Sequence, residues 1–244
     1  MTYNNITVAE AVCRYRRRAG AFAPRAALID MDGTIYNSMP HHTLAWQQMM
    51  RDIGVECTRN EFYLYEGMTG AATIRMLLQR AGLPEPSDER VRELYAVKSR
   101  YFNEMERVGP VPGVERVLHA LRDAGIDRVI VTGSGQASLI DRLEADFHGI
   151  FSADRMITSH SVIHGKPHPE PYLRGMEIVG VKPTEAIVLE NAPLGIESGH
   201  ASGAFTIAVT TGPIPPEKLW EAGADVVFPD MNRLADLLPD LLNA

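Results

Sequence analysis

The sequence predicts an α/β fold, a doubly wound parallel sheet with a helical insertion after its first strand. Short apolar segments alternate with amphipathic helical segments over most of the 244 residues, a pattern typical of a parallel sheet covered by helices on both faces. Residues 40–108 break this alternation because they carry helical patterns and no convincing strand. The composition, 45% hydrophobic and 23% charged, is that of an ordinary folded domain.

Six short apolar segments, bounded by polar or turn residues, are the expected strands. In chain order they are residues 26–30, 128–132, 156–158, 186–190, 206–210 and 226–228. Apolar residues at helical spacing predict helices in the insertion at residues 43–53, 59–65, 71–81 and 88–107. Outside the insertion, helices are expected at residues 8–18 and 136–143.

These elements divide the chain into an N-terminal extension at 1–24, a first part of the core at 25–39, a helical cap at 40–108 and a second part of the core at 109–244. A helical module inserted beside a strand end is placed to act as a lid over a site there. The extension carries four arginines in "CRYRRRAGAFAP". We expect it to form a helical arm packed on the domain, with partner binding as the alternative.

The bulk composition narrows the classes of partner and location. The net charge of −7 argues against nucleic acid as a main partner, since such proteins usually carry a basic patch. The apolar runs are too short to cross a bilayer, so no membrane partner is expected. Two cysteines, Cys13 and Cys57, suggest no disulfide framework and favour a cytoplasmic location. A monomer is compatible with the sequence, which leaves the oligomeric state open.

Polar clusters lie at or near the carboxyl ends of the expected strands. They are Asp30 with Asp32, Thr132 with Gly133 and Ser134, Lys166 before Pro167, and Glu190 with Asn191. Each has an ordinary explanation when taken alone: an Asx-turn, a helix N-cap or a solvated lysine. Together they are expected to converge on one crevice at the edge of the sheet. An acid pair, a hydroxyl, a cation and an amide suit phosphoryl transfer with Mg²⁺, which prefers oxygen ligands.

Four motifs, "DMDGT", "VTGSG", "GKPHPEPY" and "LENAPLGIESG", resemble in order and spacing the motifs of the haloacid dehalogenase (HAD) superfamily. The insertion after the first motif resembles the C1 cap of the β-phosphoglucomutase-like subfamily. The resemblance covers the chain from about residue 26 to its end, and it implies a Rossmannoid core.

The resemblance implies a catalytic role for each matching residue. Asp30 would be the nucleophile that forms an aspartyl-phosphate, and Asp32 would be the general acid and base. Thr132 would hold the phosphoryl oxygens together with the backbone around Gly133 and Ser134. The presence of Asp32 also argues against a dehalogenase, which attacks carbon and does not need that acid.

The same resemblance assigns the charged groups around the reaction. Lys166 would neutralise charge between Asp30 and the phosphoryl group. Mg²⁺ would be bound by Asp30, the backbone carbonyl of Asp32 and Asn191, with Glu190 binding it through water. These are expectations from the family pattern.

Asn191 departs from that pattern, because the subfamily usually has aspartate there, and an amide brings no charge to the metal. Glu66, from the cap, would restore the charge and approach the metal directly. In the same loop Gly67 and Thr69 fit the mutase pattern, but Gly70 stands where a phosphate-binding arginine is expected. A cap that closes over the metal leaves room for a small substrate such as inorganic pyrophosphate. The chain looks like the inorganic pyrophosphatase branch of the subfamily.

Alternatives remain open at this point. The chain could be a β-phosphoglucomutase, a phosphatase of several small esters, or a non-catalytic binder of a phosphate ligand. His42 could assist Asp32 or contact substrate, although a hinge residue without a chemical role is the favoured interpretation. Trp46 is expected in the core of the cap, and Arg75 on a solvated helix face rather than as a cation of the site.

Overall fold

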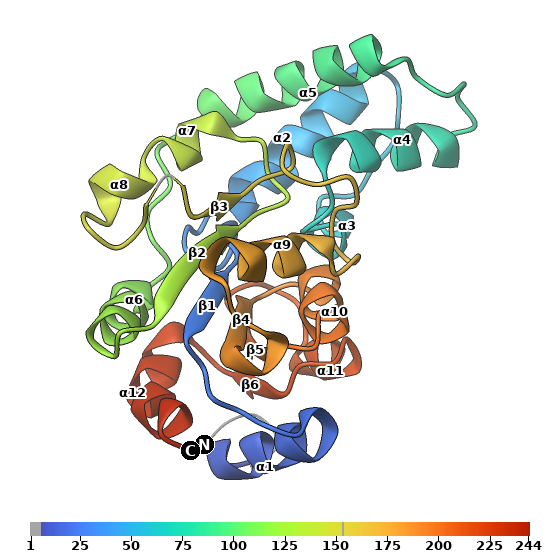
Figure 1. Ribbon diagram of the computed structural model, residues 1–244. Helices are drawn as coiled ribbons and strands as arrows, with labels where there is room; N and C mark the ends of the chain where they lie inside the picture. Colours follow the sequence, from blue (N-terminus) through green and yellow to red (C-terminus); the bar gives the residue numbers. More distant parts are fainter. Residues whose placement is uncertain (1–5, 153) are drawn as a thin grey trace.

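The structure is a computed structural model that describes residues 6–152 and 154–244. Its sheet has the strand order β3-β2-β1-β4-β5-β6, with every neighbouring pair parallel (Figure 1). The strands are β1 (Ala26–Ile29), β2 (Asp127–Val131), β3 (Met156–Ile157), β4 (Ala186–Glu190), β5 (Phe205–Val209) and β6 (Val226–Phe228). The predicted doubly wound parallel sheet is confirmed.

The central strand β1 explains why the polar clusters meet. All four of its residues are buried, and it pairs in parallel with β2 on one side and β4 on the other. The apolar run stops at Ile29, so Asp30 is the first residue beyond the strand. Thr132 likewise follows directly after β2, while Glu190 is the last residue of β4. Parallel strands end at the same edge, which brings these residues together.

Helices cover both faces of the sheet. They are α1 (Val8–Ala19), α6 (Val114–Asp123), α7 (Ala137–Ile140), α8 (Leu143–Asp146), α9 (Glu170–Val179), α10 (Pro193–Ala201), α11 (Pro216–Glu221) and α12 (Met231–Leu242), with a 3-10 turn at Pro183–Glu185. Because side chains alternate along a strand, Ile29 packs on the side of α6 and α12, whereas Leu28 packs against α9. The sheet is therefore buried on both faces.

The expected N-terminal helix forms as α1 and packs on the core. Thr7 and Glu10 make a reciprocal capping box at its start. Tyr15 is fully buried, and its hydroxyl donates to the carbonyl oxygen of Gly203 at 2.8 Å. Arg18 forms an ion pair with Asp225. The predicted helical arm on the domain surface is confirmed.

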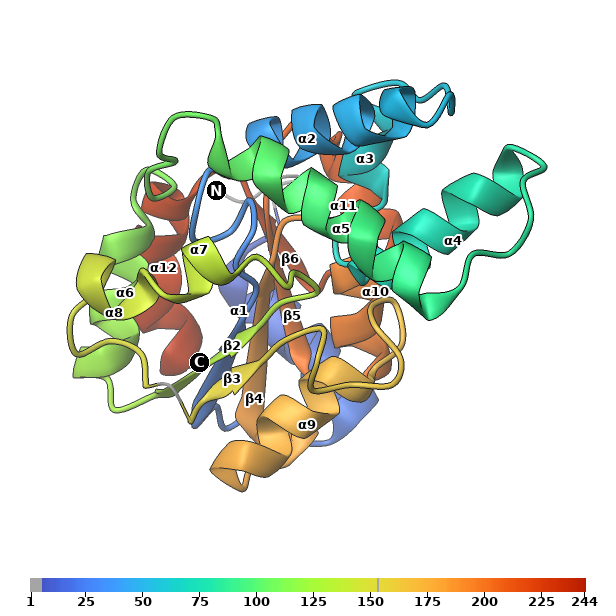
Figure 2. The ribbon, with the colours of Figure 1, turned by 90° about the horizontal axis from the view of Figure 1, so that it is seen from above.

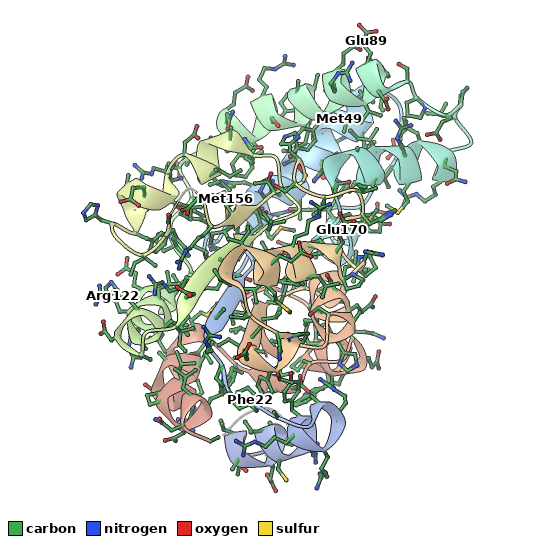
Figure 3. The ribbon with its side chains drawn as sticks, in the orientation of Figure 1. Phe22, Met49, Glu89, Arg122, Met156 and Glu170 are labelled. Carbon is green, nitrogen blue, oxygen red and sulfur yellow. The ribbon has the colours of Figure 1, made fainter. Side chains whose placement is uncertain are left out.

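The insertion forms one layer of four helices, which we call the helical layer. It consists of α2 (Met39–Asp52), α3 (Glu61–Leu64), α4 (Gly70–Arg80) and α5 (Asp88–Asn103). The layer has an apolar core of its own that includes Met49, whereas Glu89 on α5 is exposed (Figure 3). It lies over the sheet edge where the strands end (Figures 1 and 2). The exact boundaries of the predicted cap and core segments stay a prediction.

Three helices are shorter than predicted. The expected helix 88–107 ends at Asn103, whose Oδ1 accepts hydrogen bonds from Gln136, which precedes α7, and from Ser138 in α7. The helix expected at 136–143 is divided into the two short helices α7 and α8, and that expected at 59–65 is the single turn α3. Within the described part of the chain, no helix has the length and apolar character needed to cross a membrane.

Candidate active site

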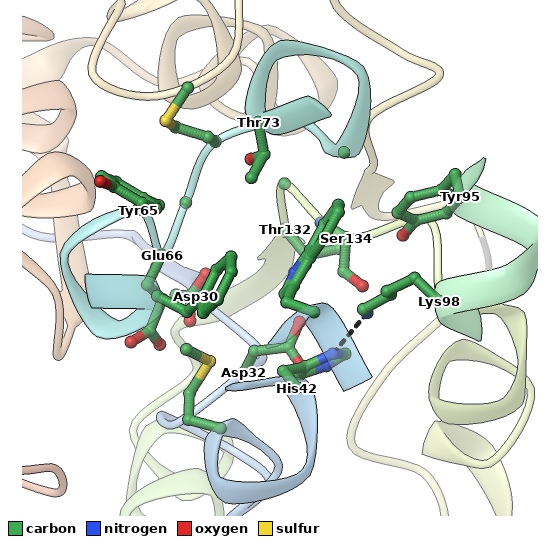
Figure 4. Close-up of a pocket in the computed structure, with 17 residues that line it drawn as sticks. Asp30, Asp32, His42, Tyr65, Glu66, Thr73, Tyr95, Lys98, Thr132 and Ser134 are labelled. Carbon is green, nitrogen blue, oxygen red and sulfur yellow. Dashed lines mark hydrogen bonds and ion pairs between the residues drawn. The ribbon is translucent and has the colours of Figure 1, made fainter. Parts of the chain in front are cut away.

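A small cavity lies between the strand ends and the helical layer (Figure 4). Its volume is about 50 Å³. The core contributes Asp30, Asp32, Thr132, Gly133 and Ser134 to its lining, and the helical layer contributes His42, Trp46, Glu66, Tyr95 and Lys98 among others. The structure thus brings together residues from distant parts of the chain, as the strand-end pattern predicted.

The helical layer is closed on the core in this structure. A Cβ atom added to Gly133 would lie 2.4 Å from the carbonyl oxygen of Gly67, so the two loops approach each other at backbone distance. Only glycine permits so close an approach at position 133. Gly67 itself has a φ of +96°, a conformation that favours glycine.

Lys166 is the centre of a buried polar cluster in the core. Its Nζ donates to Asp30 Oδ1 at 2.6 Å and to Glu190 Oε1 at 2.6 Å, and to the carbonyl oxygen of Val131 at 3.0 Å. The hydroxyl of Tyr172 donates to the same Glu190 oxygen at 2.8 Å. Burial alone would lower the pKa of Lys166, but the two carboxylates raise it above its usual value. Lys166 is therefore a fixed cation beside Asp30.

Asp30 keeps one oxygen free. Its Oδ2 is buried and has no hydrogen-bond partner among the described residues. Burial and the neighbouring charge of Glu190 raise the pKa of Asp30 to about 8, although Lys166 acts in the opposite direction. A buried carboxylate with a free oxygen is suited to a metal ion or to bonding with phosphorus.

Asp32 is held by a second cluster that crosses from the core into the helical layer. Its Oδ1 accepts a hydrogen bond from Ser38 Oγ at 2.6 Å and lies 2.9 Å from His42 Nε2. Lys98 Nζ lies 2.6 Å from His42 Nδ1 (Figure 4). Burial would raise the pKa of Asp32, but the contacts with His42 and Ser38 lower it to about 2.

The contacts of His42 with Lys98 and Asp32 decide which nitrogen of the imidazole carries the proton. Burial and the proximity of Lys98 lower the pKa of His42, and burial lowers the pKa of Lys98 to about 7. A neutral imidazole that accepts from Lys98 at Nδ1 carries its proton on Nε2 and donates it to Asp32. His42 also stacks on Phe102, with ring centroids 4.3 Å apart. These contacts give His42 a place in the site, which the hinge interpretation did not include.

Glu66 and Asn191, which the sequence analysis assigns to the same metal site, contact each other directly. Asn191 Nδ2 donates to Glu66 Oε1 at 2.9 Å, and Asn191 Oδ1 accepts from Thr34 Oγ1 at 2.9 Å. Glu66 is only 8% exposed, and burial together with the charge of Asp30 raises its pKa well above the usual value. A carboxylate of the helical layer is thus buried against the core residue that lacks a charge.

Two sequence expectations differ from what the structure shows. Thr69 is not among the residues that line the cavity, and its hydroxyl caps α4 by accepting from the Ala72 backbone. Glu190 uses one oxygen for Lys166 and Tyr172 and the other for two backbone N–H groups, so no oxygen is left for a metal-bound water.

Sequence reasoning missed several residues of the site, among them Lys98 and Tyr95. A signal for Lys98 existed, because α5 buries a helical stripe of Val91, Leu94, Lys98 and Phe102, in which the lysine is the only polar member. A lysine within an apolar stripe needs a buried partner. Tyr95 gave no such signal, since an aromatic residue beside that stripe is expected in any helix core.

The donor set fits a hard divalent cation. The described residues include no group of three or more His, Cys, Asp and Glu side chains placed as a metal site. Magnesium needs fewer protein ligands, because it keeps several waters and accepts carbonyl and amide oxygens. The free Oδ2 of Asp30 and the crowding of buried carboxylates around it provide such a place.

A family model agrees with the motifs. The model described as "Haloacid dehalogenase-like hydrolase" matches residues 27–209. Hexitol phosphatase A of Escherichia coli is 30% identical over 182 residues, which are 75% of this chain and 81% of that protein. The 2-deoxyglucose-6-phosphate phosphatase 2 of Saccharomyces cerevisiae is 27% identical and covers 88% of this chain and 91% of its own.

A solved structure agrees with the whole fold. A putative beta-phosphoglucomutase from Bacteroides vulgatus superimposes with a TM-score of 0.92 at 39% sequence identity, covering 97% of each chain. The similarity therefore includes the helical layer as well as the sheet. It fits the resemblance to the C1-capped, β-phosphoglucomutase-like subfamily.

Proposed function

The chain belongs to the haloacid dehalogenase-like hydrolase family, and from that membership we propose that it is a magnesium-dependent phosphohydrolase with an aspartyl-phosphate intermediate. We propose inorganic pyrophosphate as its substrate. The observation that carries the substrate choice is Glu66, a carboxylate of the helical layer buried against Asn191 beside Asp30. This places a carboxyl group, rather than a phosphate-binding cation, over the reaction centre, and a cation bound beside it would favour the charged form of that carboxyl.

Asp30 and Asp32 divide the chemistry between them. An oxygen of Asp30 forms a bond to one phosphorus of pyrophosphate as the bridging P–O bond breaks, and the departing phosphate takes a proton from Asp32. Asp32 then takes a proton from water, whose oxygen bonds to the aspartyl phosphorus and releases the second phosphate. The negative charge of bound substrate raises the pKa of Asp32 from its low value, which lets it carry that proton.

The other core residues stabilise the transferring group. Lys166 holds Asp30 in place and supplies a positive charge next to it. The Thr132 hydroxyl and the backbone around Gly133 and Ser134 face the same cavity and can donate to phosphoryl oxygens. Their arrangement at a strand end requires no movement of the core.

Asp30, the Asp32 carbonyl and Asn191, with Glu66 nearby, would hold Mg²⁺. When bound, the ion supplies positive charge that keeps Asp30 ionised and neutralises phosphoryl oxygens. Without a cation, the pKa of Asp30, about 8, would leave this nucleophile largely protonated at pH 7. Glu66 supplies the charge that an aspartate at position 191 would have brought, and this is the role we propose for it.

The size of the closed cavity also favours a small substrate. Its volume of about 50 Å³ is room for roughly three to five waters. A hexose phosphate carries a whole ring beyond its phosphate group. Gly70, where a mutase has its phosphate-binding arginine, packs against Tyr95, and a side chain here would displace that ring, because an added Cβ would lie 2.2 Å from it.

A sugar-phosphate phosphatase or mutase is the second candidate. It is favoured by the names of the relatives, which include a hexitol phosphatase, a 2-deoxyglucose-6-phosphate phosphatase and a putative beta-phosphoglucomutase. In that case the helical layer would have to stand further from the core during catalysis. A non-catalytic binder is the least supported candidate, since Lys166 pairs with Asp30 and Ser38 holds Asp32, so both carboxylates have their supporting contacts.

The test is phosphate release from the purified protein with Mg²⁺. Pyrophosphate, glucose 6-phosphate and β-glucose 1-phosphate are compared at equal concentration, with Asp30→Asn as the control. We expect strong preference for pyrophosphate and loss of activity in the control. Conversion of β-glucose 1-phosphate to the 6-phosphate would instead identify a mutase. Absence of turnover, and of an aspartyl-phosphate mimic formed with beryllium fluoride, would identify a binder.

A further inference from the structure

Glu66 faces a second hollow in addition to the catalytic cavity. This hollow, which we call the side pocket, has a volume of about 180 Å³. Residues that follow β1, β4 and β5 line it together with residues of α2 and α3, among them Asn37, Tyr63 and Thr211. Met39 and Glu66 line both the side pocket and the catalytic cavity. The two hollows are therefore neighbours on either side of Glu66.

The boundary between the two hollows includes a contact between two polar side chains. Asn191, which lines the side pocket, donates from Nδ2 to Glu66 Oε1 at 2.9 Å. Gly33 leaves the space in which this pair lies, because an added Cβ there would lie 2.2 Å from Asn191 Nδ2 and 2.8 Å from Glu66 Oε1. Elsewhere the layer closes at backbone distance, between Gly67 and Gly133. A hydrogen bond between side chains can open without any movement of the layer.

The lining of the side pocket suits a cation that carries its waters. Among the described residues that line it, Glu66 is the one whose side chain can carry a charge, and that charge is negative. Asn37, Tyr63 and Thr211 add amide and hydroxyl groups, and Thr211 Oγ1 donates to the carbonyl oxygen of Gly33 at 2.6 Å. The volume of about 180 Å³ is room for roughly twelve to eighteen waters. This exceeds the octahedral water shell of Mg²⁺.

We propose that the side pocket is the route by which Mg²⁺ reaches and leaves the site while the helical layer stays closed. The inference rests on the metal site of the proposed function. The cation passes between Glu66 and Asn191, whereas pyrophosphate enters only when the layer separates from the core at Gly67 and Gly133. A carboxylate on a narrow path favours cations over anions, so the same residue keeps phosphate out of the side pocket.

A disulfide can hold the helical layer closed for the test. An added Cβ at Gly165 would lie 3.8 Å from the Cβ of Thr69, a separation typical of disulfides. Thr69→Cys together with Gly165→Cys therefore links the start of α4 to the loop that carries Lys166, in a chain whose Cys13 and Cys57 are replaced by serine. Neither linked position lines the catalytic cavity or the side pocket. The reduced form of the same chain is the matched control, because its layer is free to open.

The experiment measures exchange of the metal rather than turnover. Mn²⁺ is the probe, since the free ion is seen directly by electron paramagnetic resonance, and its release is followed after addition of excess Mg²⁺. Gly212→Trp places a large ring at the side pocket, at a position where an added Cβ meets nothing within 4 Å. Leu44→Trp is its control, because Leu44 is 39% exposed and lines neither hollow. Asn37→Trp replaces Gly212→Trp if circular dichroism shows that the latter does not fold.

We expect the locked and the reduced protein to release Mn²⁺ at similar rates, while the locked protein no longer takes up pyrophosphate. Gly212→Trp should slow release from the locked protein by about tenfold or more, because passage of an ion depends on the width of its path, and Leu44→Trp should not. Mn²⁺ that stays trapped in the locked protein, uptake of pyrophosphate by it, or release unchanged by Gly212→Trp overturns the route and leaves the proposed function standing. A reduced protein that binds no Mn²⁺ overturns the proposed metal site itself.

Discussion

Two buried lysines reach the catalytic site from different parts of the molecule, and their surroundings shift their pKa values in opposite directions. Lys166 lies between the carboxylates of Asp30 and Glu190, which raise its pKa. Lys98 faces the imidazole of His42 and the rings of Trp46, Tyr95 and Phe102, and burial lowers its pKa to about 7. We call the two groups the Lys166 cluster and the Lys98 cluster.

The difference shows how partners rather than burial decide the charge of a lysine. Both side chains are almost completely buried, so each loses its hydration. Only Lys166 recovers this loss through direct contact with two carboxylates. The Lys166 cluster therefore belongs to the stable core. The Lys98 cluster connects the helical layer to Asp32 and is suited to respond to closure and to pH.

The two clusters should differ most in the stability that is lost when each lysine is replaced by methionine. Lys166→Met leaves two carboxylates buried without a cation and should destabilise the fold by about 3–5 kcal/mol. It should also lower kcat by about 10²–10³. Lys98→Met places an apolar chain among aromatic rings and should cost far less stability. Urea unfolding of both variants checks this, and equal losses would show that the two clusters are alike in energy.

Glu66→Gln tests the proposed contribution of the helical layer to the metal site. The amide keeps the shape of Glu66 and its proximity to Asn191 but removes the charge. Pyrophosphate hydrolysis should fall by about 10–100-fold, and the Mg²⁺ concentration for half-maximal activity should rise. Titration of activity with Mg²⁺ measures both, with Glu89→Gln, at an exposed position of α5 that does not line the cavity, as the matched control. An unchanged Mg²⁺ requirement would contradict the compensating role of Glu66.

The same contrast shows what the sequence could predict. Asp30 and Thr132 lie directly after strands whose apolar runs end at a position that the sequence itself shows. Their convergence at one edge of the sheet follows from the parallel strand order alone. The assignment of Glu66 to the metal site was made from the missing charge at Asn191. The position of Lys98 within an apolar helical stripe shows that it is buried, but the stripe does not identify its partner His42. The ends of α5 and α7 depended on Asn103 and Gln136 meeting across the chain, which local patterns do not contain.

The two clusters should also differ in how they make folding stability depend on pH, a property that can be measured on the wild type. The pKa of Lys98 is about 7 in the folded chain and near the ordinary lysine value of 10.5 in the unfolded chain. Between these values the unfolded chain binds the additional proton, so this group makes stability rise with pH. The slope is at most about 1.4 kcal/mol per pH unit. Unfolding of the wild type relative to Lys98→Met from pH 7 to 10 measures it.

Asp30 makes folding stability change with pH in the opposite direction, and Asp30→Asn therefore serves as the control variant. Its pKa rises from 3.8 to about 8 in the fold, so the folded state binds the additional proton and stability falls as pH rises through that window. Asp30→Asn should remove this fall and leave the rise from Lys98 in place. A flat difference between the wild type and Lys98→Met above pH 7 would contradict the lowered pKa of Lys98.

The smallest effect is expected from Arg75, a cation of the helical layer that belongs to neither cluster. Its guanidinium pairs with Glu85 and Asp88, whose side chains are 68% and 84% exposed. Such surface pairs contribute less than about 1 kcal/mol. Arg75→Ala should therefore leave kcat/KM for pyrophosphate within about twofold of the wild type and change the unfolding midpoint little. A large loss of activity would mean that Arg75 reaches the substrate when the helical layer moves, and that this layer supplies a cation as well as the carboxylate of Glu66.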